Sequence, residues 1–380
     1  MESILLLALW MPQTRGCPQL DIQLNDEEKE NLLLDICPCK WHNCTLNSIQ
    51  KKAVAHILRG EVYNNPYVIF GPPGIGKTVT LHFQIFKFIS SARLLVGTPS
   101  NSSTDLITTH LIECGVFKIG EFTRLVSKNH VEKELIPEHL MSYCATLGIG
   151  IDDTCKNNRI VTKSGLKLKR QKYLGRHRVT IGSCATLDNF LQMGFPSNHF
   201  THVLIDDASQ CTETEIMMAV AQVSKERGQV ILAGDPHQLQ AIFMKKYALE
   251  RGFSLSFLER IFRVLHTFPL TYGFDLRMVT KLLDNYRALL SILNVCNELF
   301  YNAELVPMIR EENSREAEML KQLDDILPQS PNRPKTYGIF FYGIRSANLQ
   351  EKDSPSWYNP YETKNVNCTA KPLNLNALAS

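Results

Sequence analysis

One stretch of the chain, Gly71-Pro-Pro-Gly-Ile-Gly-Lys-Thr78, constrains the fold more than any other feature. It matches G-x-x-x-x-G-K-[ST], the pattern of a phosphate-binding loop. The apolar run Tyr67-Val-Ile-Phe70 before it predicts a buried strand, and the residues from Thr78 to about Ile89 predict a helix. In this strand–loop–helix context, backbone N–H groups of the loop point at phosphate oxygens. The pattern therefore predicts a nucleoside triphosphate site in an α/β domain.

Two side chains of this loop are expected to touch the phosphates and their metal directly. Lys77 would reach the β- and γ-phosphates, and the hydroxyl of Thr78 would ligate Mg²⁺. ATP is favoured over GTP because the chain shows no guanine-reading Asn-Lys-x-Asp. The candidate cofactor contacts of the loop are Gly71, Pro72, Pro73, Gly74, Ile75, Gly76, Lys77 and Thr78.

Strand-like runs alternate with helical patterns along the middle of the chain. Leu94–Val96, His202–Ile205 and Val230–Leu232 read as buried strands, and Ile49, Ala53, Val54, Ile57 and Leu58 share one helical face. Thr212 with Glu215 matches a capping box that opens another helix. This alternation predicts an α/β fold with a parallel sheet flanked by helices, whose ligands bind beyond the carboxyl ends of the strands.

Acidic side chains follow two of these strands. Asp206 and Asp207 come directly after His202–Ile205, where Asp206 would hold Mg²⁺ and Asp207 would orient the attacking water. Asp235 and Gln238 follow the next strand and are candidates to sense the γ-phosphate. Each pair taken alone also fits an ordinary turn or helix cap. The phosphate loop upstream favours the functional interpretation.

A basic stripe between residues 163 and 178 is the main local charge feature. It carries seven Lys or Arg and no acid, while the whole chain has a formal net charge of only +3. Such a stripe neutralises nucleic-acid phosphates, with Lys169 and Arg170 as the candidate contacts. The alternative is a solvated hairpin turning at Ser164-Gly165.

Length and cysteine content exclude other classes. A chain of 380 residues fits two domains, and no apolar run approaches the roughly 20 residues of a membrane span. Eleven scattered cysteines in a chain of this size indicate reduced thiols and a cytoplasmic protein. The cluster Cys37-Pro-Cys-Lys-Trp-His-Asn-Cys44 would hold zinc only with a further, distant ligand.

The order of the motifs resembles superfamily 1 helicases of the Upf-like branch, and within it the Mov-ten/Armitage group of RNA helicases linked to small-RNA silencing. The resemblance covers about Thr45 to Glu362. Its segments, in chain order, are Leu46–Gln50 (Q motif), Gly71–Thr78 (motif I), Thr98–Ser102 (motif Ia), Val179–Cys184 (a further strand-end motif), Asp206–Gln210 (motif II), Gly234–Leu239 (motif III), Leu283–Arg287 (the opening motif of the second motor domain) and Ser354–Pro360.

This resemblance implies roles for further residues. Gln50 would read adenine, Tyr286 would stack on it, and Arg287 would reach the γ-phosphate as an arginine finger. Ser100 and Asn101 would face the nucleic-acid backbone, and Thr180 would contact a phosphate. The catalytic set is then Asp207, Gln238 and Arg287.

The fold implied is RecA-like, with one complete and one partial RecA-like domain. The expected divisions are an N-terminal segment at 1–44, a first ATP-binding helicase domain at 45–262, a partial second domain at 263–362 and a divergent tail at 363–380. We find no counterpart of motifs V and VI.

The activity implied is that of an ATP-dependent RNA helicase of piRNA-type silencing. It would bind ATP with Mg²⁺ and single-stranded RNA, work beside Argonaute or Piwi proteins, and reside in the cytoplasm or in ribonucleoprotein granules. Departures from the family pattern support an alternative. The second acid of motif II is Asp207 instead of Glu, and motif VI is missing. Ile75 replaces Thr in motif I, and motif III continues as Gln240-Ala241. An acid recessed by about 1 Å can cost roughly a hundredfold in a positioned reaction. The alternative is therefore an ATP- and RNA-binding scaffold with weak or no hydrolysis.

Overall fold

The computed structural model describes most of the chain between residues 46 and 370. The described residues are 46–80 (except 61, 63, 64 and 79), 92–146 (except 116, 118, 119, 128, 129, 132 and 134), 159–161, 167–170, 177–187, 199–241 (except 225–227), 246–264, 278–309, 315, 318, 339, 343–350 and 357–370.

The chain divides into two compact units. Unit 1 comprises Met1–Pro72 and Gly76–Leu282, and unit 2 comprises Pro73–Ile75 and Leu283–Ser380. Strand β10 (Val279–Lys281) pairs with β1 (Tyr67–Phe70) and so lies in the sheet of unit 1, although the sequence suggested a border at residue 262. Unit 1 thus extends to the end of this strand, while the four divisions expected from the sequence stay predictions.

Unit 1 is built on a ten-stranded sheet with the order β10-β1-β9-β8-β2-β7-β3-β4-β6-β5. Every pairing is parallel except that of β5 with β6, so the predicted α/β fold with a parallel sheet is confirmed. The remaining strands are β2 (Leu94–Thr98), β3 (Phe122–Val126), β4 (Cys144–Thr146), β5 (Arg159–Val161), β6 (Lys167–Arg170), β7 (Val179–Ser183), β8 (His202–Ile205) and β9 (Gln229–Gly234).

The four predicted strands are all present. β1 and β8 have the predicted bounds, and β2 and β9 run further toward their carboxyl ends. β1, β2, β7 and β8 are buried along their whole length. Each fully buried aliphatic side chain contributes about 1.5–3 kcal/mol, and these strands therefore form a rigid support for the loops that follow them.

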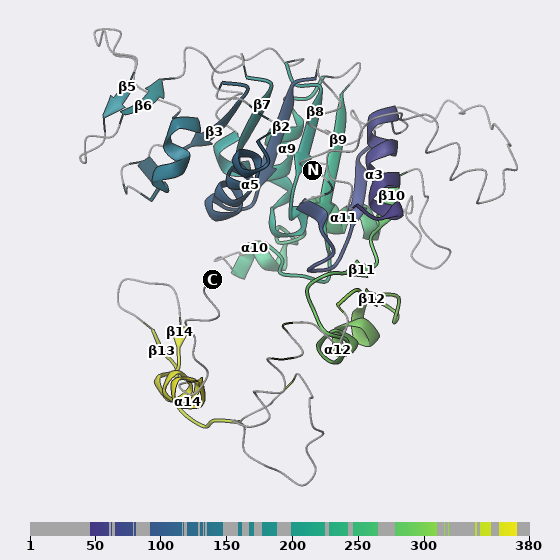
Figure 1. The fold of residues 1–380 in the computed structure, drawn as a ribbon, viewed down its shortest axis with the longest axis vertical. Helices are drawn as coiled ribbons and strands as arrows, with labels where there is room; N and C mark the ends of the chain where they lie inside the picture. The colour runs from purple at the N-terminus through teal and green to yellow at the C-terminus, as the bar shows by residue number, and fades with distance from the viewer. Residues whose placement is uncertain are drawn as a thin grey trace, which may run out of the picture. The chain divides into compact units, whose positions relative to one another are not determined.

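Helices pack against this sheet. Figure 1 shows α3 beside β10 at one margin and the β5–β6 pair at the other. α5 contacts β2, β3 and β7, whereas α9 contacts β2 and β8. The helical elements of unit 1 are α3 (Ser48–Arg59), α5 (Asn101–Glu113), η1 (Glu138–Tyr143), α7 (Cys184–Leu187), η3 (Ala208–Gln210), α9 (Glu213–Val220), α10 (Lys246–Glu250) and α11 (Phe257–Val264).

Two of these helices begin at capping boxes. Thr212 accepts a hydrogen bond from the Glu215 N–H and Glu215 reaches back to the Thr212 N–H, as the sequence predicted for α9. Asn47 and Gln50 form the same reciprocal pair at the start of α3. Such caps satisfy N–H groups that a helix leaves unpaired, and each contributes about 1 kcal/mol.

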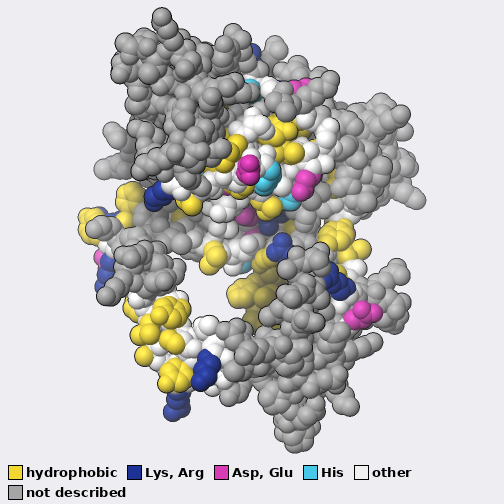
Figure 2. Space-filling model, turned by 60° about the vertical axis from the view of Figure 1, so that its left-hand side comes forward, with side chains coloured by type: hydrophobic (Ala, Val, Ile, Leu, Met, Phe, Trp, Pro, Cys, Tyr) yellow, Lys and Arg dark blue, Asp and Glu magenta, His cyan; other side chains and the backbone are white. Residues whose placement is uncertain are grey.

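Unit 2 has shorter elements. Its described parts are β11 (Asp284–Asn285), α12 (Leu290–Phe300), β12 (Val306–Pro307), β13 (Leu349–Gln350), β14 (Trp357–Tyr358) and α14 (Pro360–Ala370). β11 pairs with β12 in parallel, and β13 pairs with β14 antiparallel. Large apolar side chains of these elements are exposed, Leu299 and Trp357 among them. Figure 2 shows exposed hydrophobic side chains, in yellow, on one face of the molecule.

Several predictions fall outside the described residues. They are the segment 1–44, the cysteine cluster 37–44, the helix predicted from Thr78 to Ile89 beyond Thr80, most of the basic stripe, and the tail after residue 370. Among the helices that the structure describes, we find none with the length and apolar character of a membrane span.

Candidate nucleotide and nucleic-acid edge of the sheet

The predicted motifs meet at one edge of unit 1. The phosphate loop follows β1, motif III follows β9, motif II follows β8, and motif Ia follows β2, and these four strands are consecutive neighbours in the sheet. Backbone hydrogen bonds join Gly71 N–H to the Gly234 carbonyl and Asp206 N–H to the Gly97 carbonyl. The carboxyl edge of an open parallel sheet is where such folds bind ligands.

The phosphate loop has the backbone that its glycines permit. Gly74 and Gly76 have φ of 81° and 78°, a region that other residues rarely adopt. Lys77 is buried, and its ammonium donates to the carbonyl oxygens of Gly71 (2.7 Å) and Pro72 (3.2 Å). The lysine therefore lies across the concave side of the loop, where a phosphate oxygen can replace a carbonyl as its acceptor.

Gln50 supports this loop from the side. A Cβ on Gly76 would lie 2.8 Å from Gln50 Nε2, so the amide fills the space that a larger residue would need. Its other amide atom, Oε1, accepts from the Asn47 N–H at 3.1 Å. The Gln50 amide thus lies between the start of α3 and Gly76 of the phosphate loop, and its adenine-reading role stays a prediction.

Thr78 and Asp206 form the oxygen pair expected of a magnesium site. The Thr78 hydroxyl donates to Asp206 Oδ2 at 3.0 Å, and Asp206 Oδ1 accepts from the Asp207 N–H at 3.0 Å. Burial raises the pKa of the Asp206 carboxyl, while Lys77 and the two hydrogen bonds oppose that rise. A hydroxyl and a buried carboxylate this close match the hard oxygen ligands that Mg²⁺ prefers, so these residues fit that ion.

Asp207 has an unusual backbone. Its φ of 49° and ψ of 45° put it in the left-handed region, in which Asp and Asn are tolerated better than other side chains. It directly precedes η3, the short turn that continues motif II. The second acid of motif II is therefore carried by a residue whose conformation itself favours a short side chain.

Asp235 and Gln238 contact each other. Gln238 Nε2 donates to Asp235 Oδ2 at 3.1 Å, and Asp235 Oδ1 accepts from the His237 N–H at 2.9 Å. Asp235 is fully buried, whereas Gln238 is partly exposed. The carboxylate thus anchors the motif III turn, and Gln238 is the one of the two that this structure leaves accessible to a phosphate.

Within unit 2, Asn285 contacts Pro73–Ile75, the three residues of the phosphate loop that belong to this unit. Its Nδ2 donates to the Pro73 carbonyl at 2.8 Å, and its Oδ1 accepts from the N–H groups of Arg287 and Ala288. The Tyr286 N–H donates to the Gly74 carbonyl at 2.8 Å. Tyr286 and Arg287 have exposed side chains. Asn285 lies within the Leu283–Arg287 motif, but its contacts to the phosphate loop could not be predicted from that motif.

At motif Ia, Ser100 is exposed and caps α5, because its Oγ accepts from the Ser103 N–H at 3.1 Å. Asn101 contacts the protein interior instead: its Oδ1 accepts from Arg124 at 3.0 Å. The expectation that both side chains face a nucleic acid therefore fits Ser100 better than Asn101. Arg124 was missed because nothing in its local sequence distinguishes a buried arginine from a surface one.

Thr180 does not occupy a strand end. It is the second residue of β7, opposite Leu95 and Thr123, and is fully buried, so this structure gives a phosphate no access to it. The strand ends three residues later at Ser183, which pairs with Thr98 of β2 and hydrogen-bonds Thr186 at 2.7 Å. The Val179–Cys184 motif thus ends beside β2, but Thr180 lies near the amino end of the strand, away from the edge that carries the other motifs.

Lys169 and Arg170 lie on β6. This strand pairs with β4 and β5 near one margin of the sheet, with β7, β3 and β4 between it and β2. A nucleic-acid contact there would be separate from the one at motif Ia.

Fold and site together define a P-loop nucleotide-binding domain of the helicase type. The family described as an AAA domain (AAA_11) matches residues 169–246, which include motifs II and III. The "Probable RNA helicase armi" of Drosophila melanogaster is 49% identical over 362 residues, covering 93% of this chain and 30% of that protein. RNA helicase Mov10l1 of Homo sapiens is 32% identical over 336 residues, covering 86% and 25%.

Over most of its length the chain is similar to superfamily 1 helicases, in the group of Armitage and its Mov10 relatives. It spans less than a third of the length of these two relatives. A solved structure of Pif1 helicases on forked double-stranded DNA matches with a TM-score of 0.35 and 16% identity, covering 74% of this chain and 52% of that one. A score of that size adds nothing to the assignment, which depends on the sequence relatives and on the sheet edge.

Proposed function

We propose that this chain carries the ATP-binding part of an RNA helicase that acts in small-RNA silencing of the piRNA type. The observation that carries the proposal is the 3.0 Å contact between the Thr78 hydroxyl and Asp206, which joins motifs I and II beside the buried Lys77. ATP is the substrate, and Lys77 binds its terminal phosphates. Thr78 and Asp206 would hold Mg²⁺, which when bound neutralises phosphate charge.

The remaining parts of this proposal follow from the resemblance to the Mov-ten/Armitage group. They are single-stranded RNA as the nucleic acid, Argonaute or Piwi proteins as partners, and the cytoplasm or its ribonucleoprotein granules as the location. Motif Ia supports RNA binding because its exposed Ser100 lies at the same sheet edge as the phosphate loop. Binding mainly through phosphates predicts a steep loss of RNA affinity with added salt.

A second candidate function is an ATP- and RNA-binding scaffold with weak or no hydrolysis. One observation favours it: the second acid of motif II is the short Asp207, held in a left-handed backbone conformation. A carboxylate set back from the attacking water slows hydrolysis without affecting nucleotide binding.

ATP hydrolysis by the purified chain, with and without single-stranded RNA, decides between the two. Turnover stimulated by RNA and lowered at least about a hundredfold by Lys77→Ala supports the helicase proposal. Absent turnover with ATP still bound through Lys77 supports the scaffold. Unchanged ATP affinity in Lys77→Ala would overturn both, since each needs the phosphate loop. Lys246→Ala is a matched control, because it removes the same side chain from an exposed position on α10.

A further inference from the structure

Arg124 on β3 is a charged side chain in the interior of unit 1. It is completely buried and is one of the largest side chains in the described part of the core with no exposed surface. Its Nε lies 2.9 Å from Oδ1 of Asp105, whose side chain is 16% exposed. A buried guanidinium destabilises a fold unless nearly all its N–H groups find acceptors, so its partners indicate why this fold keeps it.

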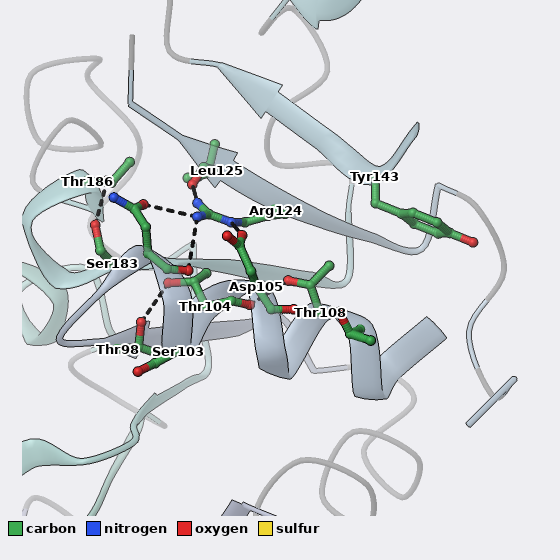
Figure 3. Close-up of polar contacts among 12 residues, drawn as sticks. Thr98, Ser103, Thr104, Asp105, Thr108, Arg124, Leu125, Tyr143, Ser183 and Thr186 are labelled. Atoms are coloured by element: carbon green, nitrogen blue, oxygen red, sulfur yellow. Dashed lines mark hydrogen bonds and ion pairs between the residues drawn. The ribbon is translucent and has the colours of Figure 1, made fainter. Parts of the chain in front are cut away.

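The other arms of the guanidinium contact backbone and a second side chain. Nη2 donates to Asn101 Oδ1 at 3.0 Å and to the Asn101 carbonyl at 3.5 Å, while Nη1 donates to the Leu125 carbonyl. Asn101 and Asp105 are four residues apart on α5 and therefore share a helix face. Figure 3 shows Arg124 directed at Asp105 from the neighbouring strand. One side chain thus fixes the first two turns of α5 to β3.

Hydroxyl groups hold the same turn from its other side. The Ser100 carbonyl accepts from Thr98 Oγ1 (2.8 Å) and from Thr104 Oγ1 (2.7 Å), and those two hydroxyls contact each other at 2.6 Å (Figure 3). Thr98 and Thr104 are fully buried, whereas Ser100 is exposed. The turn from Thr98 to Asn101 is therefore held from the interior through Thr98, the Ser100 carbonyl and Asn101, while the Ser100 side chain stays exposed.

We infer that Arg124 is a positioning residue for RNA binding: by holding Asn101 inward, it fixes the turn from Thr98 to Asn101 in the shape that meets a phosphate backbone. The inference rests on the proposed function, because it assumes that RNA crosses this sheet edge. The competing explanation is an ion pair that stabilises unit 1 and has no effect on RNA.

A double-mutant cycle separates the two explanations. Arg124→Lys keeps a positive charge opposite Asp105 but cannot donate to two partners in a fork. The full chain, Arg124→Lys, Asn101→Ala and the double variant are titrated into a fluorescein-labelled oligouridylate and a fluorescent ATP analogue. Each single variant is expected to weaken oligouridylate binding about tenfold, and the double variant no further, because the two act through one contact. ATP-analogue binding should not change.

Arg260→Lys is the matched control. Arg260 on α11 makes a two-pronged contact with Glu213, both N···O distances being 2.6 Å. Its loss should lower the melting temperature but leave oligouridylate affinity unchanged. Losses that add in the double variant, or an Arg124→Lys variant that only melts earlier, would overturn the inference. Should Arg124→Lys fail to fold, Asp105→Asn takes its place. An unchanged oligouridylate affinity in Asp105→Asn would likewise overturn the inference.

The design also distinguishes this inference from the function on which it rests. If the wild-type chain binds oligouridylate and the variants bind it equally well, the positioning role alone is refuted. A wild-type chain that does not bind oligouridylate at all refutes RNA binding and, with it, the role of Arg124.

Discussion

Two halves of one sheet edge use polar residues in different ways. In the nucleotide half, at the ends of β1, β9 and β8, Lys77 and Asp206 contact loop carbonyls and the Thr78 hydroxyl at the edge itself. In the β2–β7 half, the charged Arg124 lies behind the edge and reaches it only through Asn101. A ligand can replace the partners of the first set but not those of the second. Nucleotide binding should therefore depend on single groups, and binding at the β2–β7 half on the shape of a turn.

The largest effect is expected at Asp206. Asp206→Asn keeps the size of the side chain but removes the charge that would hold Mg²⁺, so ATP turnover should fall roughly a thousandfold. Oligouridylate binding without nucleotide should stay the same, because the β2–β7 half is untouched. Steady-state hydrolysis and RNA titration check both statements, and an equal loss in the two assays would remove the distinction between the halves.

The same variant should be more stable at neutral pH. Burial raises the folded-state pKa of Asp206 above its ordinary value, so the folded protein holds this proton more tightly than the unfolded one. Stability from this group is therefore fully present below the ordinary pKa and is lost as the pH rises through the folded pKa. Asp206→Asn cannot ionise, so the variant keeps this stability as the pH rises. Thermal melts without nucleotide should show a higher midpoint for the variant at neutral pH and a smaller difference in acid.

Asp207 should have the next largest effect. Asp207→Asn suits the left-handed backbone and removes the carboxylate, so turnover should fall about a hundredfold with ATP affinity unchanged. Asp207→Glu extends the acid and should raise turnover about tenfold, although the backbone conformation costs the longer side chain about 1 kcal/mol of stability. Hydrolysis rates and melting midpoints of both variants test this. A Glu variant slower than wild type would show that the short acid suits this site.

Gln50 and Asn47 form a matched pair for the loop support. Each substitution to Ala breaks the capping box of α3 and should cost about 1 kcal/mol of stability. Only Gln50 also packs against Gly76 of the phosphate loop, so only Gln50→Ala should weaken ATP binding, by about tenfold. Equal ATP affinities in the two variants would mean that Gln50 is a helix cap alone.

The parts of the fold that local patterns determine were predictable from sequence. A continuous apolar run before a phosphate loop predicted β1, and Thr212 with Glu215 predicted the start of α9. Both could be predicted because strand burial and helix capping depend on near neighbours in the chain. The phosphate loop and motif II were likewise predictable, since strand ends of a parallel sheet converge on one edge.

Side-chain direction was not predictable. The sequence places Asn101 and Thr180 in nucleic-acid motifs, yet Asn101 points at Arg124 and Thr180 is in the interior of β7. Which way a side chain points depends on strand register and on partners far away in sequence: Arg124 is 23 residues from Asn101. A strand predicted to within one residue still leaves its two faces undetermined, because successive side chains alternate between them.

The smallest effect is expected from the hydroxyls that hold the motif Ia turn. Thr98→Val keeps the shape of a buried side chain but loses its bonds to the Ser100 carbonyl and Thr104, at a cost of about 1–2 kcal/mol. Thr108 lies on α5, one turn after Thr104, and Thr108→Val loses a bond to the Thr104 carbonyl at a similar cost. If the β2–β7 half acts through the shape of its turn, Thr98→Val should weaken oligouridylate binding about threefold and Thr108→Val should not. Equal affinities in the two variants, with both melting earlier, would mean that these hydroxyls stabilise α5 without shaping a binding surface.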